Sequence, residues 1–68
     1  MKFGDAVSYY LAEKGMTAKE LAKKSGFTEA YISQLRGKRG NDPTFTRAIA
    51  IIDALGVDID EFAAKVDE

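Results

Sequence analysis

The side chains that could do chemistry in this chain are charged groups, hydroxyls and amides, because its 68 residues include no cysteine and no histidine. Cysteine and histidine are the usual zinc ligands, and histidine is the usual general base near neutral pH. The stretch Gly37-Lys38-Arg39-Gly40 lacks the spacing of a phosphate-binding P-loop. We therefore expect a protein that is not an enzyme and that holds neither a metal ion nor a cofactor.

The formal net charge is only −1, but the charges are distributed unevenly along the chain. Residues 14–39 contain seven basic and two acidic side chains, a local net charge of +5. Residues 53–68 contain one basic and six acidic side chains, a local net charge of −5. A chain with this charge distribution can direct its basic segment toward phosphates and its acidic segment away from them. The acidic segment is most simply a solubilising surface.

Apolar residues recur three and four positions apart along five segments, which is the pattern of amphipathic helices. We therefore expect one all-α domain of five helices occupying residues 1–68. The expected core-facing residues are Phe3, Ala6, Val7, Tyr10 and Leu11 in the first segment, Phe45, Ala48, Ile49, Ile52 and Leu55 in the fourth, and Ile59, Phe62, Ala63 and Val66 in the fifth. Tyr9 and Ile51 fall outside these stripes and are expected either to be scattered exposed residues or to form a partner surface.

Capping residues and glycines mark the expected helix ends. Thr17 and Glu20 have the spacing of a capping box, in which each side chain satisfies the other's backbone amide. Pro43 suits the first position of the fourth helix, where no amide hydrogen is needed. The expected N-caps are Thr17, Thr28, Asp42 and Asp58. Glycines 15, 26, 37 and 56 are expected to end the helices that precede them.

The second and third helices are joined by only three residues, Gly26-Phe27-Thr28. A connection this short forces the two helices to cross steeply, as they do in a helix-turn-helix. Gly26 is expected to adopt a positive φ, which costs glycine little. The small side chain of Ala22 would let the two helices approach closely.

The pattern Met16-Thr17-x-x-Glu20-Leu21-Ala22-x-x-x-Gly26-Phe27-Thr28-x-x-Tyr31-Ile32-Ser33-x-Leu35 resembles the Cro/phage-repressor (XRE) class of helix-turn-helix proteins. The run Ala54-Leu55-Gly56-Val57-Asp58-Ile59-Asp60-Glu61-Phe62 resembles the junction between the fourth and fifth helices of that class. The resemblance covers nearly the whole chain. It implies a five-helix, lambda-repressor-like domain whose third helix enters the major groove of double-stranded DNA.

The resemblance also implies which residues would touch DNA. The implied base-reading residues are Thr28, Glu29, Ala30 and Gln34, and the implied phosphate-binding residues are Thr17, Ala18, Lys19, Ser33, Lys38, Arg39 and Asn41. Gln34 can pair with an adenine edge, and Glu29 can accept from a cytosine amine. Two alternatives stay open: Lys19 would equally suit an ordinary solvated face, and Glu29 would equally suit a favourable first-turn charge or a group that repels phosphate.

The sequence departs from the class pattern in three places. Ala18 stands where the class often has a glutamine that clamps the DNA backbone, so that only the backbone amide of Ala18 is offered. Arg36 stands where the class often has an acidic residue. Gly37 comes early and Gly40 is additional in the loop after the third helix. These departures affect the expected phosphate contacts more than the general mode of binding.

The function expected from these features is a sequence-specific transcriptional regulator, and within that class a repressor. The resemblance places a pairing surface at Val57, Asp58 and Ile59, from which we expect a weak homodimer that forms fully on a palindromic site. Two alternatives stay open, an antitoxin that binds its own promoter and a toxin, and a protein-interaction domain on the same fold. Asp5 and Glu13 interrupt the apolar N-terminal residues, which argues against a signal peptide or membrane span and for a cytoplasmic protein.

Overall fold

The computed structural model describes residues 1–37 and 40–68. Over these residues the chain forms five helices and no strand. The helices are α1 (Phe3–Lys14), α2 (Ala18–Ser25), α3 (Glu29–Leu35), α4 (Phe45–Leu55) and α5 (Ile59–Val66). The all-α, five-helix fold expected from the apolar periodicity is confirmed.

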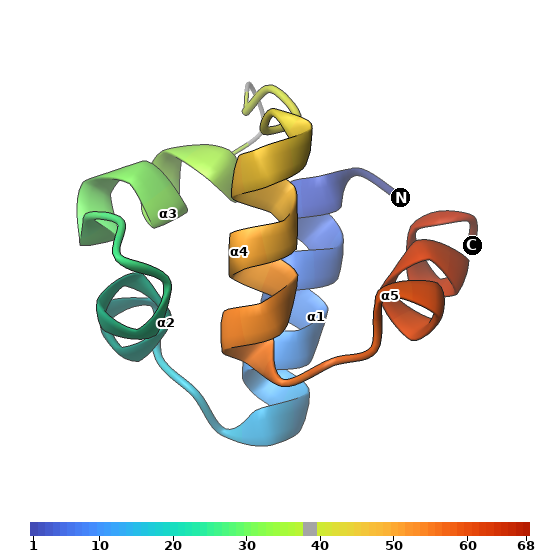
Figure 1. The fold of residues 1–68 in the computed structure, drawn as a ribbon, viewed down its shortest axis with the longest axis horizontal. Helices are drawn as coiled ribbons and strands as arrows, with labels where there is room; N and C mark the ends of the chain where they lie inside the picture. The colour runs from blue at the N-terminus through green and yellow to red at the C-terminus, as the bar shows by residue number, and fades with distance from the viewer. Residues whose placement is uncertain (38–39) are drawn as a thin grey trace.

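The helices are grouped around α4. Figure 1 shows α4 in the foreground with α1 behind it, α2 and α3 on one side and α5 on the other. Helix α2 packs against α3 and α4, and α5 packs against α1 and α4. As a consequence, the helix-turn-helix pair and the acidic fifth helix lie on opposite sides of α4.

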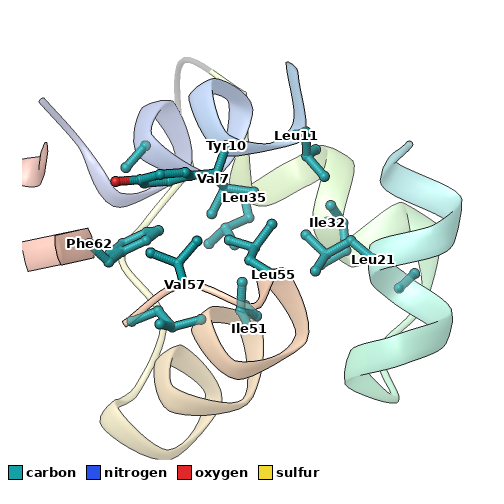
Figure 2. Close-up of a cluster of buried hydrophobic side chains, with 13 residues drawn as sticks. Val7, Tyr10, Leu11, Leu21, Ile32, Leu35, Ile51, Leu55, Val57 and Phe62 are labelled. Carbon is teal, nitrogen blue, oxygen red and sulfur yellow. The ribbon is translucent and has the colours of Figure 1, made fainter. Parts of the chain in front are cut away.

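The core is one cluster of apolar side chains drawn from all five helices (Figure 2). Its largest fully buried members are Phe62, Leu21, Ile32, Ile51, Leu55 and Val7. The ring of Tyr10 lies in the same cluster, and its hydroxyl donates a hydrogen bond to Glu61 Oε2 at 3.3 Å. This hydrogen bond satisfies the polar end of a buried aromatic side chain and ties α1 to α5.

Helix α4 corrects two expectations about which residues are buried. Ile51, expected outside the core stripe, is fully buried, whereas Phe45, expected inside it, is 80% exposed. Helix α4 is covered by α2 on one flank as well as by the core behind it, so its buried arc extends to Ile51. Phe45 is the first residue of the helix, and α2 does not cover the helix at that end.

Two expected boundaries also need correction. Helix α4 begins at Phe45 with Thr44 as its N-cap, two residues later than Asp42 and Pro43 suggested. Helix α3 ends at Leu35 with a right-handed cap at Arg36 rather than with a glycine cap at Gly37. Asp58 does stand at the N-cap of α5, but its side chain makes no capping hydrogen bond. At the two corrected ends several nearby residues suit the end of a helix, and the contacts of the helix with its neighbours select one.

Helix α5 turns fewer of its apolar residues inward than expected. Phe62 is buried and Val66 is partly buried, but Ala63 is exposed and Ile59 is 49% exposed. Because α5 packs mainly along α1 and α4, the start of the helix extends past the core. Ile59 therefore belongs to the surface.

Candidate nucleic-acid interface

The joint between α2 and α3 is built by local hydrogen bonds. Gly26 adopts the left-handed conformation, with φ of 82°. The amides of Gly26 and Phe27 both donate to the Ala22 carbonyl at 3.0 Å. The Thr28 hydroxyl then accepts from the Tyr31 amide at 3.0 Å and starts α3. The expected positive φ at Gly26 and the expected cap at Thr28 are confirmed.

Packing holds α3 rigidly against the rest of the domain. Ile32 is fully buried, Leu35 is buried beside it, and Ala22 is buried where α2 meets α3. From the other side, Gly4 of α1 lies so close to the Leu35 carbonyl oxygen that any β-carbon at position 4 would clash with it. A helix fixed at these points can present its outer face in a constant orientation, which sequence reading requires.

The outer face of α3 is the one that sequence analysis assigned to base reading. Thr28, Glu29, Ala30 and Gln34 are all exposed, as is Ser33. Ala30 and Gln34 are four residues apart and therefore lie one above the other on the same side of the helix. The small side chain of Ala30 leaves the longer Gln34 room to extend outward from the helix.

At the start of α2, the residues expected to bind phosphate, Thr17, Ala18 and Lys19, lie next to the negatively charged Glu20. The Thr17 hydroxyl accepts from the Glu20 amide at 3.1 Å and lies 3.2 Å from the Glu20 carboxylate, to which it donates. The Thr17 amide donates to the same carboxylate at 3.1 Å. These hydrogen bonds, the backbone one foremost, lower the pKa of Glu20, so a negative charge persists beside the exposed Lys19 and the half-buried Ala18.

A polar hollow of about 250 Å³ lies between α3 and the start of α4. Gln34 and Asn41 both line it, so the structure brings together a residue expected to read bases and one expected to hold phosphate. Lys38 and Arg39, the other two loop residues expected to bind phosphate, lie outside the described residues.

Arg47 is a residue of this region that sequence analysis missed. Its guanidinium carbon lies 5.5 Å from the centroid of the Tyr31 ring, and Arg47 lines the same hollow as Gln34. The fourth segment was interpreted only as a core helix, and so its exposed cation was passed over. The signal that could have found it is a lone arginine in the first turn of that helix, next to the loop that follows α3.

Arg36, one of the residues that depart from the class pattern, is directed toward α1. Its Nε donates to the Ser8 hydroxyl at 2.8 Å, and that hydroxyl donates to the Gly4 carbonyl at 3.2 Å. Arg36 thus ties the end of α3 to α1. The guanidinium keeps further donors on its exposed side.

The three residues of the expected pairing surface differ in how far they are exposed. Val57 is buried in the core, whereas Asp58 and Ile59 are exposed. All three line a second hollow of about 330 Å³ between α4 and the start of α5.

Among the described residues no helix is long and apolar enough to cross a membrane, and no group of acidic side chains could hold a metal ion.

The fold and this site together define a helix-turn-helix domain. The helix-turn-helix family model matches residues 7–62, and the chain belongs to that family, whose members are DNA-binding transcriptional regulators rather than enzymes. The resemblance to the Cro/phage-repressor class is confirmed. The chain is also 40% identical over 57 residues to an uncharacterised HTH-type transcriptional regulator, y4dJ, of Sinorhizobium fredii, covering 82% of this chain and 71% of the relative. No solved structure gives a significant match.

Proposed function

We propose that this domain is a sequence-specific repressor of transcription that inserts α3 into the major groove of double-stranded DNA. The observation that carries the proposal is the exposed polar face of α3, where Thr28, Glu29, Ala30 and Gln34 are held outward while Ile32 and Leu35 anchor the helix in the core. A rigid helix with hydrogen-bonding groups along one face is what direct readout of base edges requires.

The spatial distribution of charge supports the same orientation. Lys19, Lys23 and Lys24 are exposed on α2, and Arg47 is exposed beside α3. The exposed carboxylates of α5 lie on the opposite side of α4. With α3 in the groove, the acidic helix is directed away from the phosphates, so the net charge of −1 is compatible with DNA binding.

The proposal also covers the oligomeric state of the protein on DNA, its location in the cell and its phosphate contacts. Two copies of this single domain would bind the two halves of a palindromic site about one turn of DNA apart. The protein would act in the cytoplasm without a cofactor, and the phosphate contacts would come from the start of α2, Ser33, Asn41, Arg47 and the loop at residues 38–39.

The decisive experiment is a selection of binding sites from random duplexes with the purified domain at moderate salt. We expect enrichment of one short motif with two-fold symmetry. The selected duplex should then be bound at least about 10³-fold more tightly than a scrambled duplex of equal length. Equal affinity for the selected and scrambled duplexes would overturn sequence-specific binding, and failure to bind any duplex would leave a protein-interaction role.

A further inference from the structure

The end of α3 lies against the start of α1 (Figure 1), and one arginine joins the two helices. Arg36 is the C-cap of α3, and its Nε donates to the Ser8 hydroxyl at 2.8 Å. This hydrogen bond uses one of the five N–H donors of a guanidinium. Among residues 1–37 and 40–68, no carboxylate forms an ion pair with Arg36. Its charge and the N–H donors of its two terminal nitrogens are therefore available to a ligand.

Arg36 lies on the same side of α3 as residues expected to contact DNA. Its backbone is right-handed and close to helical, with φ of −82° and ψ of −8°, so Arg36 keeps the register of the helix. Glu29, Ser33 and Arg36 follow the i, i+4, i+7 spacing of one helix face, and all three are exposed. Ser33 is one of the residues expected to bind phosphate. Arg36 thus extends this outward side of the helix and adds a cation to it.

Helix α1 holds the guanidinium in place in the absence of a ligand. The Ser8 hydroxyl accepts from Arg36 Nε and donates to the Gly4 carbonyl at 3.2 Å, so the hydroxyl is itself fixed. The two backbones approach closely because Gly4 has no side chain: a β-carbon there would lie 3.1 Å from the Arg36 α-carbon. A side chain that is ordered in advance loses less conformational freedom on binding. The planar fork of a guanidinium matches the geometry of a phosphate.

The start of α2 lacks what the end of α3 has gained. Ala18 offers no side-chain donor there, and the lowered pKa of Glu20 keeps a negative charge nearby. Arg36 places a cation where the class pattern often has an acidic residue. The two departures from the class pattern are therefore complementary, because a donor is lost at one end of the helix-turn-helix and a cation is gained at the other.

We propose that Arg36 binds a phosphodiester of the DNA backbone through its terminal NH2 groups, and that Ser8 is the positioning residue that orients its guanidinium. The proposal rests on the proposed function and deepens it, because it adds a phosphate contact at the end of α3 and gives α1 a part in DNA binding. In the alternative role, Arg36 only ties α3 to α1. The two roles differ in how DNA binding depends on salt.

The first test measures affinity by fluorescence anisotropy at several salt concentrations. Arg36→Ala should weaken binding to the selected and the scrambled duplex alike, by about tenfold, and make the slope of log affinity against log salt shallower by about one unit. Arg36→Lys keeps the charge but not the fork, so it should keep the slope and lose part of the affinity. Losses of affinity with an unchanged slope in both variants would overturn the phosphate contact, because a purely structural tie releases no counterion.

Ser8→Ala tests the positioning role. It removes the acceptor of the Arg36 Nε but leaves the charge, so affinity should fall about threefold at an unchanged slope. The loss should disappear in an Arg36→Ala background, because the two residues act through one contact. Ser25→Ala is the matched control, since the Ser25 hydroxyl also donates to a helix carbonyl, that of Ala22 at 3.3 Å; it should bind DNA as the original chain does. No loss for Ser8→Ala, or a loss that persists without the arginine, would overturn the positioning role.

The phosphate can be located by replacing single phosphates of the selected duplex with neutral methylphosphonates. At one position in each half-site, the replacement should weaken binding of the original chain but not of Arg36→Ala. Thermal unfolding without DNA should show that this variant is folded; if it is not, Arg36→Gln removes the charge with a smaller change of shape and replaces it. The absence of any position whose effect depends on Arg36 would overturn the contact.

The outcomes separate this proposal from the function on which it rests. Phosphate contacts carry no sequence information, so the Arg36 contact remains measurable on a scrambled duplex even if the selection yields no preferred site. A selected site bound equally well by the original chain and by Arg36→Ala would overturn this proposal and leave the proposed function standing. Failure to bind any duplex would overturn both.

Discussion

The guanidinium of Arg47 lies 5.5 Å from the centroid of the Tyr31 ring, and the Tyr31 ring lies 5.0 Å from the ring of Phe27. Three residues, from the turn, from α3 and from α4, are thereby in contact one after another, with the two rings tilted by 47°. A cation over an aromatic face is attracted by the electrons of the ring. The contact with Tyr31 holds the positive charge of Arg47 next to the hollow that Gln34 and Asn41 also line.

Arg47→Ala should therefore weaken binding to all duplexes alike. We expect the slope of log affinity against log salt to become shallower by about one unit, as for one lost phosphate contact. Lys65→Ala removes an equal charge from α5, on the far side of α4, and should leave the slope unchanged. A slope that responds equally to both variants would mean that Arg47 acts only through net charge.

Gln34→Ala should affect sequence choice rather than general affinity. We expect a loss of about 1–3 kcal/mol on the preferred site and a relaxed preference at one base pair, because a bidentate pair with a base edge is lost. Repeating the site selection with this variant would identify the base pair. If the losses on preferred and scrambled duplexes are the same, Gln34 positions the protein and does not read sequence.

Replacing both Lys38 and Arg39 by alanine tests the loop after α3. Two lost phosphate contacts should flatten the salt slope by about two units and weaken binding to every sequence. Fluorescence anisotropy at several salt concentrations would measure both effects. An unchanged affinity together with an unchanged slope would remove the loop from the interface.

Gly26→Val should destabilise the fold. Gly26 has φ of 82°, which a β-branched residue adopts only under strain of about 1–3 kcal/mol, a large part of the stability of so small a domain. Thermal unfolding should show a Tm lower by several degrees. Gly26→Asn should lose much less, because asparagine tolerates left-handed backbone. Equal Tm values for the Val variant and the original chain would contradict the structural role of this turn.

Stability should fall at high pH because of Tyr10. Burial, followed by the nearby Glu61 carboxylate, raises the pKa of Tyr10 above its usual value of 10.0. The unfolded chain therefore loses this proton first, so the contribution is complete below about pH 10 and is lost as the pH rises through the folded pKa. Urea unfolding at pH 8 to 11 should show this decline, and Tyr10→Phe should show less of it than Tyr9→Phe.

Much of the fold was predictable because its signals are local. The capping box at Thr17 and Glu20, the cap at Thr28 and the left-handed Gly26 each depend on residues within one helical turn. Such groups form the same hydrogen bonds wherever the helix is placed. The positions of the five helices and the outward face of α3 follow from them together with the apolar periodicity.

Helix α4 shows where periodicity alone was insufficient. Phe45 and Ile51 are both apolar, and both lie near the edge of a plausible buried stripe. Which of them is buried depends on how far α2 covers the flank of α4. The start of the helix was equally ambiguous, because Asp42 and Thr44 are both good N-caps.

The candidate site was likewise only partly accessible from the sequence. The polar positions of α3 followed from the resemblance. Arg47 did not, because its proximity to Tyr31 joins residues 16 positions apart in two different helices, α3 and α4. The exposure of Phe45 beside an apolar hollow also required the packed structure.

The sequence by itself thus determined the five helices, most of their ends and the short turn between α2 and α3, since these depend on interactions within a few residues. The tertiary structure alone decided the contacts between distant segments, such as Arg36 with Ser8, Tyr10 with Glu61, and Gly4 with the Leu35 carbonyl. Each of these contacts requires two helices to settle at one depth and angle. That choice is made by the packing of the whole core, to which every helix contributes at once.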